Sequence, residues 1–510
     1  MRFITSFLLA ALTALPALAD TPKFKTQEDF FNKIVAAHDN SFNDDCGDGF
    51  QTLRDGVSSE YFETGLNEDG QAAVYQALAR CAGNADDRAT FNFAHESWRA
   101  YGRTDELGWS YRWQLWQQIQ WKDVDAALLT ANAFLHSPDT PHSELEIRQL
   151  WELQRTIFSE YENESEWTRI VELYEMVEAS GYRDQDPFMK RFDDTTVLTR
   201  TLLKLGRTDD ARRAGEAVTD PDAIIVMAVQ KLFDPIRPGS SFDHDTDFVA
   251  LFEQRLTDIE TQVALNPQHM HGPFTQAQLL RRLGRPDEAA DLLTSTLETH
   301  YADPEHYTDA DDFLNWVYND LAYIQAANNE LEDALLNFER AIAWGESEFP
   351  NVSQMINMAS VLMRNGRFDE ALTRVGRVGL ASDFGKMFVE GINACAAYQD
   401  GDESRAEGHL EYLVEHRTEN YSALQETYYC MDRLDDAEAL LIERLQSDNY
   451  SDTALMALQN FRIYPVEAEL FQLLKSRQAE VHARAGVQET AAEHGYILNI
   501  PIYDIYWGDS

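Results

Sequence analysis

Few residues of this chain have the types and spacing that chemistry needs, and the tightest pair is His269 with His271. Two imidazoles hold a metal ion only with a third ligand and with outer hydrogen bonds, and the sequence offers neither. A surface loop between two helices is the simpler interpretation. The 510 residues contain no HExxH, GxSxG, CxxC or phosphate-binding glycine motif. We therefore predict no catalytic residue, no metal and no cofactor.

Two acidic segments have the composition of cation-binding loops. Residues 43–49 lack the Glu that closes a calcium loop, which favours a solvated turn. Residues 235–247 are the clearest long loop, and their acidic end, residues 243–247, contains three Asp and one His. These side chains suit a hard cation, or they cap a helix that begins near Asp247.

Residues 109–121 contain four tryptophans, of which Trp109, Trp113 and Trp116 share one helical face. Packing between helices is the usual meaning of such a stripe. The alternative is a stacking surface for a ligand, which would make the chain a cell-wall glycan binder.

A short signature recurs between apolar helical patterns, at residues 102–107, 206–211, 284–289, 366–371 and, less closely, 401–406. Each begins with Gly, which ends a helix in a left-handed conformation that other residues resist. Acidic residues follow in the first turn of the next helix, where the helix dipole favours negative charge. The signature predicts a series of helical hairpins.

The clearest hairpin is residues 315–342, whose two amphipathic halves meet at Asn328-Asn329. Ala322 and Ala334 allow close approach of the helices, and Tyr318 and Phe338 fill the space beside them. This spacing resembles the tetratricopeptide repeat (TPR), a helical hairpin of roughly 34 residues. The resemblance implies an all-α fold, a right-handed α-solenoid of TPR-like hairpins. One hairpin cannot bury its own apolar face, so neighbouring hairpins must stack on it.

One small or apolar residue marks the second helix of each expected hairpin. The series is Ala126, Ile170, Ala211, Ala250, Ala289, Ala334, Ala371, Ala406 and Ala437. Four first helices also keep a small residue, at Ala277, Ala322, Ala359 and Ala394. We expect all of these residues at helix–helix contacts.

In the TPR family the first helix of each hairpin lines a concave groove that holds extended peptides. Carried onto this chain, the resemblance implies partner-binding residues at Arg200, Lys204, Phe274, Gln278, Arg281, Arg282, Trp316, Asn319, Tyr323, Ile356, Ser360 and Arg364. The cations among them suit an acidic peptide or a carboxylate. Pairing of these cations with acidic neighbours along the groove is the alternative.

The intervals Cys46 to Cys81 and Cys395 to Cys430 are both 35 residues, close to one repeat. Equivalent helices of adjacent hairpins are in contact in a solenoid. We therefore predict disulfides Cys46–Cys81 and Cys395–Cys430, although four cysteines allow three connectivities. Buried free thiols are the alternative.

Acidic residues outnumber basic ones by 88 to 42, which gives a net charge of −46. This balance disfavours nucleic acid and anionic lipid as partners. It suits a cationic ligand or a saline habitat, and it also keeps a large surface soluble.

Residues 1–19 have the pattern of a secretory signal peptide, with Arg2, an apolar run over residues 3–15 and Ala17-Leu18-Ala19 before Asp20. An anchor that stays uncleaved is the alternative. No later stretch approaches ~20 apolar residues, so we expect no stable membrane insertion. The pattern predicts export to the bacterial periplasm, where disulfides persist.

The expected organisation has five parts: a signal peptide (residues 1–19), a helical N-terminal cap (20–85), a degenerate helical-repeat region (86–235), TPR-like repeats (236–450) and a C-terminal helical cap with an apolar tail (451–510). The tail is expected to cover the last helices or to add to a partner's sheet edge. We expect a non-catalytic scaffold that binds a partner protein or peptide. An accessory subunit of an envelope enzyme is the alternative.

Overall fold

The computed structural model describes residues 24–42, 46–101, 104–138, 144–158, 164–192, 194–344, 351–447 and 449–504. The expected signal peptide lies outside these residues, as do parts of the segments 43–49 and 102–107. The chain divides into two compact units, Met1–Asp193 and Asp194–Ser510, which are described separately. No helix among the described residues is both long and apolar enough to cross a bilayer.

Unit 1 is all helical in its described part. Its helices are α2 (Gln27–Ser41), α3 (Gly47–Val57), α4 (Tyr61–Gly65), α5 (Glu68–Asn84), α6 (Arg88–Tyr101), α7 (Thr104–Gln120), α8 (Val124–Leu135), α9 (Ile147–Phe158) and α10 (Glu164–Ser180). Side chains of α2, α3, α5 and α6 share one core that includes the fully buried Phe30, Leu53 and Phe91. The predicted disulfide Cys46–Cys81 is confirmed, with Cα atoms 5.5 Å apart.

Unit 2 begins with α11 and ends with a short strand. Its elements are α11 (Val197–Lys204), α12 (Thr208–Glu216), α13 (Pro221–Val229), η2 (Lys231–Phe233), α14 (Phe248–Leu265), α15 (His271–Arg282), α16 (Pro286–Ala302), α17 (Ala310–Ala327), α18 (Leu331–Ala343), α19 (Val352–Arg364), α20 (Phe368–Val375), α21 (Asp383–Gln399), α22 (Glu403–Glu415), α23 (Tyr421–Cys430), α24 (Leu434–Leu445), α25 (Ser451–Ala457), β1 (Asn460–Arg462), α26 (Glu469–His482), α27 (Ala485–His494) and β2 (Asn499–Tyr503).

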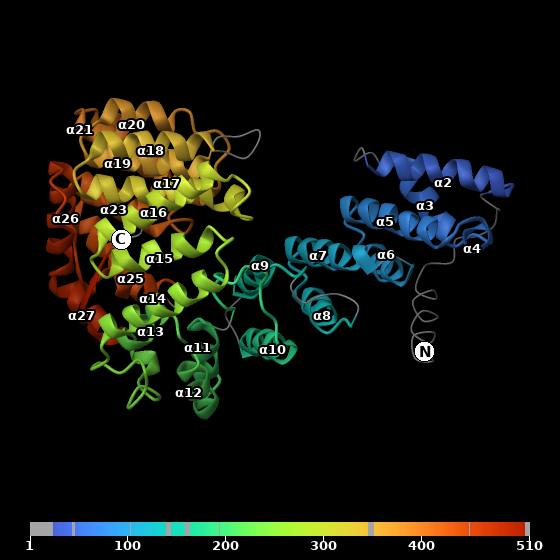
Figure 1. Cartoon of the computed structure of the whole chain (residues 1–510), viewed down its shortest axis with the longest axis horizontal. Helices are drawn as coiled ribbons and strands as arrows, with labels where there is room; N and C mark the ends of the chain where they lie inside the picture. Colours follow the sequence, from blue (N-terminus) through green and yellow to red (C-terminus); the bar gives the residue numbers. More distant parts are fainter. Residues whose placement is uncertain are drawn as a thin grey trace. The chain divides into compact units, whose positions relative to one another are not determined.

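Consecutive helices of unit 2 pair as hairpins, and the hairpins stack in chain order. Helix α15 packs on α16, α17 on α18, α19 on α20, α21 on α22 and α23 on α24, and the first helices also contact one another from α15 through α23 (Figure 1). The fold is therefore the expected all-α solenoid. The predicted alanines lie at the contacts between helices and are fully buried. In the first helices these are Ala277, Ala322, Ala359 and Ala394, and in the second helices they are Ala289, Ala334, Ala371, Ala406 and Ala437.

The turns follow the predicted chemistry. Gly206, Gly284, Gly366 and Gly401 have φ angles of +71°, +76°, +74° and +79°, so each ends its helix in the left-handed region. Asn329 takes the same role at φ +63°, because its short side chain tolerates this conformation better than most. Gly102 lies outside the described residues.

Two positions of the predicted alanine series are wrong. Ala250 is exposed, because it lies in the first turn of α14, two residues after the helix begins at Phe248. Ala126 is only half-buried and its neighbour Ala127 is fully buried, so the series is displaced by one residue in α8. The expected capping near Asp247 is confirmed, since this side chain accepts a hydrogen bond from the Ala250 amide at the start of α14.

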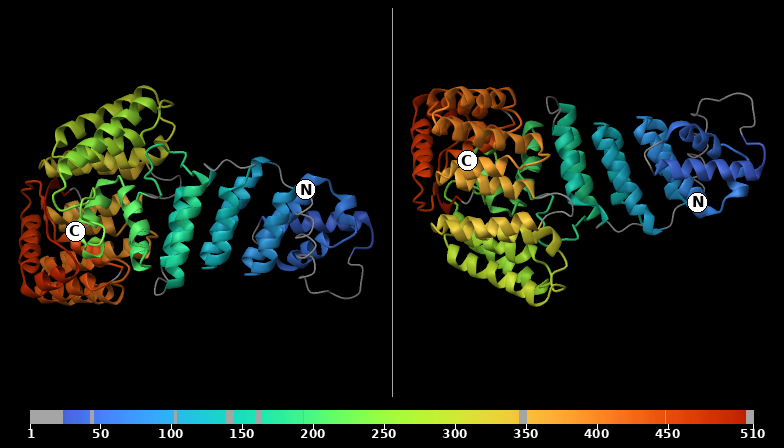
Figure 2. Two further views of the ribbon diagram at one scale, coloured as in Figure 1. Left: turned by 90° about the horizontal axis from the view of Figure 1, so that it is seen from below. Right: turned by 90° about the horizontal axis from the view of Figure 1, so that it is seen from above.

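Residues 451–504 form what we call the C-terminal arm. Helices α26 and α27 pack against α24 and lie along one side of the unit in both views of Figure 2, so the arm covers the last hairpin. The arm also reaches back to the first helices of the unit. Strands β1 and β2 pair in parallel, β2 contacts α14 and α15, and the Tyr496 amide donates to the Val229 carbonyl at 2.7 Å.

Candidate functional site

Helices α19, α21 and α23 are the first helices of three successive hairpins, and each contacts the next. The sequence allows α21 and α23 to approach closely through Gly391. A Cβ atom at this position would lie 2.9 Å from Thr427 Oγ1, which is shorter than a normal contact. The Thr427 hydroxyl is itself fixed, because it donates to the Ala423 carbonyl at 2.7 Å.

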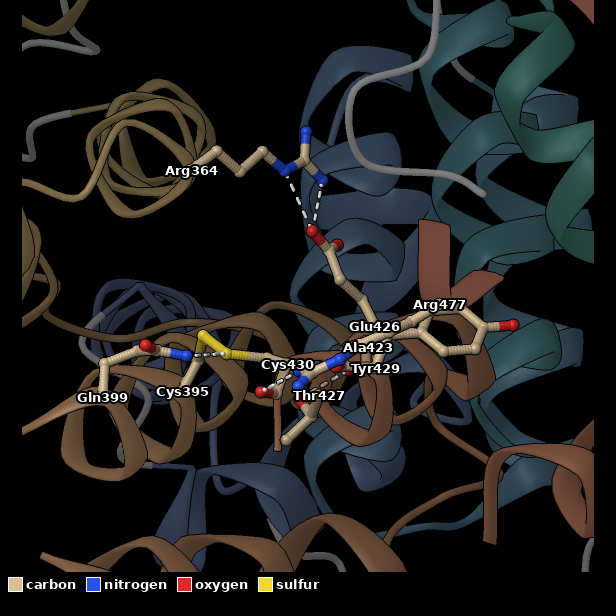
Figure 3. Close-up of a disulfide and its surroundings, with 9 residues drawn as sticks. All are labelled: Arg364, Cys395, Gln399, Ala423, Glu426, Thr427, Tyr429, Cys430 and Arg477. Atoms are coloured by element: carbon tan, nitrogen blue, oxygen red, sulfur yellow. Dashed lines mark hydrogen bonds and ion pairs between the residues drawn. A yellow bond between two sulfur atoms is a disulfide. The ribbon is translucent and has the colours of Figure 1, made fainter. Parts of the chain in front are cut away.

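A disulfide joins α21 to α23 beside this contact (Figure 3). Cys395 and Cys430 are buried, with Cα atoms 5.7 Å apart, which confirms the second predicted disulfide. Arg477 of α26 donates to the carbonyls of Tyr429 and Cys430 at 2.7 and 2.9 Å. These bonds satisfy carbonyls at the end of α23 that no further helical turn can reach.

The three helices line a small hollow that is open to solvent. Its lining combines apolar side chains, the disulfide and a few polar groups: Ser360, Met363, Phe388, Gly391, Ile392, Cys395, Ala423, Glu426, Thr427 and Cys430. An apolar hollow with a small number of convergent polar groups is typical of a binding site.

Glu426 is the carboxylate of the pocket, and Arg364 holds it in place from α19. Arg364 donates from Nε and Nη2, at 2.9 and 2.7 Å, and both bonds end on Glu426 Oε1 (Figure 3). Arg364 is 3% exposed, whereas Glu426 is partly exposed. The second carboxylate oxygen, Oε2, accepts no hydrogen bond from the described residues.

One aromatic pair extends the lining of the pocket. Phe384 lies one helical turn before Phe388, and the two rings meet edge to face with centroids 5.4 Å apart. Phe384 is 52% exposed, so this aromatic pair continues the apolar lining to the surface.

Lys475 of α26 is affected by the charges of Arg364 and Glu426. Burial lowers the pKa of Lys475 and Arg364 lowers it further, whereas Asp504 and Glu426 raise it.

Residues 274–293, which cover most of α15 and the start of α16, match the family model described as tetratricopeptide repeat. These residues therefore resemble a tetratricopeptide repeat, and the stacked hairpins of unit 2 have the helix–turn–helix architecture of such repeats. No curated protein matches the sequence.

Two solved structures align with nearly the whole chain. Yeast Tom70 is 12% identical with a TM-score of 0.33, covering 90% of this chain and 97% of its own. The pentatricopeptide repeat protein PPR10 from maize is 13% identical with a TM-score of 0.31, covering 96% of this chain and 73% of its own. At these scores neither likeness carries an argument about the site.

The three predicted partner-binding residues of α19 lie at or beside the pocket. Ser360 lines it, and Arg364 positions Glu426. Ile356 is 6% exposed, and its Cδ1 atom lies 3.6 Å from where a Cβ would project at Gly385, so it packs between these TPR-like hairpins.

The other predicted arginines already have partners within the chain. Arg281 pairs with Asp320 at 3.3 Å, Arg282 pairs with Asp222 at 2.5 Å, and Arg200 pairs with Asp452. Burial raises the pKa of Asp320, and the nearby Arg281 opposes this shift. Internal pairing therefore accounts for these three arginines, as the alternative in the sequence analysis expects.

The C-terminal arm covers this part of the inner wall. The Tyr464 hydroxyl donates to the Arg281 carbonyl at 2.5 Å, and Arg282 Nη1 donates to the Tyr503 carbonyl at 2.9 Å. The Tyr503 ring occupies the space that a side chain at Gly284 would need. The surface of α15 that faces the arm is thus covered by the chain itself, whereas the hollow of α19, α21 and α23 is open.

The remaining predicted positions are fixed by packing to different degrees. Asn319 is buried and accepts from Asn357 Nδ2 at 2.9 Å, which links α17 to α19. Tyr323 meets Phe338 edge to face within its own hairpin, at 5.4 Å between centroids. The others are partly buried: Lys204, Phe274, Gln278 and Trp316.

The candidate chemistry from the sequence does not assemble. Among the described residues no three His, Cys, Asp or Glu side chains are grouped as they would be around a metal ion. His269 lies 3.6 Å from Asp309, whereas the His271 ring stacks on Phe313 at 4.1 Å, so the two imidazoles have separate environments.

The tryptophan stripe divides between the two interpretations. Trp113 packs edge to face against Phe91 and His95 in the core of unit 1. Trp109 and Trp116 are 42% and 46% exposed, one on each side of Trp113 along the same face of α7.

Sequence reasoning missed most of the pocket. Phe384, Phe388, Gly391 and Cys395 recur at spacings of four, three and four residues along α21, the period of one helical face. That signal was present in the sequence. The partner-binding prediction, however, stopped at the hairpin of Arg364 and did not extend to α21 and α23.

Proposed function

We propose that this TPR-like protein is a non-catalytic scaffold of the bacterial periplasm that binds a segment of a partner protein in its concave face. The observation that carries the proposal is the open pocket formed by α19, α21 and α23. Two disulfides support an exported location, because such bonds persist in oxidising compartments. The signal-like residues 1–19 support the same location.

The pocket chemistry narrows the partner segment. Phe388, Ile392 and Met363 suit one apolar or aromatic anchor side chain, the kind that dominates binding energy at interfaces. Glu426 Oε2 suits an N–H donor of the same segment, since Oε1 already accepts both bonds from Arg364. An acidic segment would be repelled by Glu426 and by the net charge of −46. We therefore propose a neutral or basic segment and no nucleic acid.

The lining favours a scaffold over an enzyme subunit. An active site brings together several titratable groups with matched roles. This pocket contains one carboxylate, Glu426, and no histidine. The carboxylate is fixed by an ion pair to Arg364, and so it is suited to accepting a hydrogen bond from a partner.

Site-specific photocrosslinking tests the proposal. A photoreactive phenylalanine analogue at Phe384 should capture a partner protein in cells that export the chain. The same analogue at Leu336, which is 50% exposed on the second helix α18, is the matched control and should not capture it. Ser360→Arg, which fills the pocket, should abolish capture at Phe384. Capture that persists in Ser360→Arg, or that is equal at Leu336, contradicts the proposal.

One observation favours a second candidate function, glycan binding by unit 1. Exposed indole rings can stack on sugar rings, and Trp109 and Trp116 are both close to half exposed. Soluble peptidoglycan fragments should then shield these indoles from a fluorescence quencher, and Trp116→Ala should remove that protection. Unchanged quenching in the wild type excludes this candidate.

A further inference from the structure

The C-terminal arm follows the ends of the first helices of unit 2. At the end of α15, Arg282 Nη1 donates to the Tyr503 carbonyl at 2.9 Å. Beyond the end of α17, the Asn329 side chain accepts from the Glu467 amide at 3.0 Å. Helix α26 then packs on α19 and α23, and Arg477 reaches the carbonyls at the end of α23. The arm therefore passes from α15 toward the pocket of α19, α21 and α23.

Strand β2 directs the chain along the same path. It pairs with β1 in parallel, and the Asp504 amide donates to the Arg462 carbonyl at 2.8 Å. After Arg462, residues 463–468 lead from β1 to α26. Because parallel strands run in one direction, the chain at Asp504 is directed as it is at Arg462, toward α26 and the helices on which α26 packs.

Lys475 of α26 lies near both the last described residue and the pocket. Burial lowers the pKa of Lys475, whereas the charge of Asp504 raises it. Arg364 also lowers this pKa, and Glu426 raises it. A charge shifts a pKa in this way only when it is close. Asp504 and the carboxylate of the pocket are thus both neighbours of one side chain.

The sequence after Asp504 has the chemistry that the pocket suits. Residues 505–510 lie outside the described residues and begin Ile505-Tyr506-Trp507-Gly508. These four residues are uncharged, so the acidic surface does not repel them. Three extended residues span about 10 Å, which is the reach of Trp507 from Asp504. Trp507 combines an aromatic ring with an N–H donor.

We propose that the tail that follows Asp504 docks in the pocket of its own chain. The Trp507 ring packs against Phe388 and Ile392 of the lining. Its indole N–H donates to Glu426 Oε2, which accepts no hydrogen bond from the described residues. A partner segment of similar chemistry then displaces the tail. This inference rests on the proposed function, since it assigns an internal ligand to the same binding site.

Photocrosslinking within the purified full chain tests the proposal. A photoreactive phenylalanine analogue at Tyr506 leaves Trp507 in place and should form crosslinks to α21 within one chain. The same analogue at Leu473, which is 41% exposed on α26, is the matched control and should form none to α21. Trp507→Ala should lower the yield from Tyr506 about tenfold, because an aromatic anchor dominates such contacts. Crosslinks that join two chains, that never involve α21, or that persist in Trp507→Ala overturn the proposal.

A synthetic peptide gives a second measurement that needs no crosslink. A fluorescent peptide with the sequence of residues 504–510 is titrated with the wild-type chain and with Trp507→Ala, and its anisotropy is followed. The variant should bind the peptide about tenfold more tightly, because a tethered tail competes at a high effective concentration. Ser360→Arg, added to Trp507→Ala, should abolish binding. Failure of Trp507→Ala to bind more tightly than the wild type, or binding that Ser360→Arg leaves unchanged, overturns the proposal.

Capture of a partner at Phe384 separates this inference from the proposed function. Capture should increase in Trp507→Ala, because the tail no longer holds the pocket. Crosslinks from Tyr506 to α21 in a chain that captures no partner would support the docked tail and contradict the proposed function. A partner captured at Phe384, with no crosslink from Tyr506 to α21, would overturn the docked tail and leave the proposed function standing.

Discussion

Arg364 and Glu426 join two first helices that are separated by a whole hairpin. Both hydrogen bonds from Arg364 end on one carboxylate oxygen, at 2.9 and 2.7 Å, and the pair bridges α19 and α23 across α21 (Figure 3). An ion pair buried to this degree sets the geometry of the pocket more than it stabilises the fold, since removing two charges from water is costly.

Glu426→Gln should therefore lower the free energy of unfolding by about 3 kcal/mol, because it leaves the buried Arg364 guanidinium without its counter-charge. Urea unfolding measures the loss. The double variant Arg364→Met with Glu426→Leu should recover most of it, because no buried charge remains. A single variant as stable as the wild type would show that the pair is solvated in solution.

Gly391→Ala should destabilise unit 2 by ~1–3 kcal/mol, because the new methyl group would press on Thr427 Oγ1 at 2.9 Å. Gly408 is the matched control on α22, where a Cβ meets no atom within 4 Å. Gly408→Ala should be stabilising by ~0.5–1 kcal/mol through helix propensity. Effects of the same sign at both sites would contradict the close approach of α21 and α23.

Removal of the Cys395–Cys430 disulfide, as the double Ala variant, should lower the free energy of unfolding by about 4 kcal/mol in the chain-entropy model for a loop of this length. It should also weaken capture at Phe384, because the disulfide lines the pocket. The Cys46–Cys81 double Ala variant should destabilise unit 1 and leave capture unchanged. Thiol titration of the oxidised protein should detect no reactive thiol, since all four cysteines are paired.

The stability of unit 2 should fall as the pH is lowered from 6.5 to about 4. Burial, Lys475 and Arg444 lower the pKa of His482 to about 4. Between pH 6.5 and pH 4 this histidine is therefore protonated in the unfolded chain and neutral in the folded chain, and this difference favours unfolding. His482→Gln should flatten the dependence of the melting temperature on pH across this window. His136→Gln, at an exposed position of unit 1, is the control. A pH profile unchanged by His482→Gln would rule out this histidine as the cause.

Local chemistry made the hairpins predictable from the sequence. The turn between two helices depends only on residues within one helical turn of it: a glycine with positive φ and acidic residues at the start of the next helix. Gly206, Gly284 and Gly366 therefore mark the turns directly in the sequence. The disulfides followed from the repeat length alone. The displaced position at Ala126 shows the limit of this reasoning, since a one-residue shift in a helix changes which side chain faces inward.

An arginine at the start of several second helices, in the signature at Arg285 and Arg367 and in the related turn at Arg433, was visible in the sequence but was not interpreted. Arg285, Arg367 and Arg433 each pair with an acid three residues later in the following helix. Each also reaches an acid in the preceding second helix: Glu253, Glu332 and Glu407 respectively. The spacing within the signature predicts the first contact. The second depends on the stacking of hairpins, which spacing alone cannot give.

The contents of the groove could not be predicted, because they depend on contacts between distant parts of the chain. Nothing near Arg282 in the sequence indicates that Tyr503 will accept its hydrogen bond, 221 residues away. That the first helices form a partner-binding inner wall stays a prediction. The path of the C-terminal arm determines which part of the surface of the first helices is open to solvent.

That path also constrains how the protein can evolve. A solenoid with free ends tolerates the gain or loss of a repeat, because each unit contacts only its neighbours. Here Asp452 meets Arg200 across 252 residues, and Tyr496 meets Asp234 across 262. An added or deleted hairpin would pull these partners out of register, so the number of repeats in unit 2 is fixed by the bonds that tie its end to its beginning.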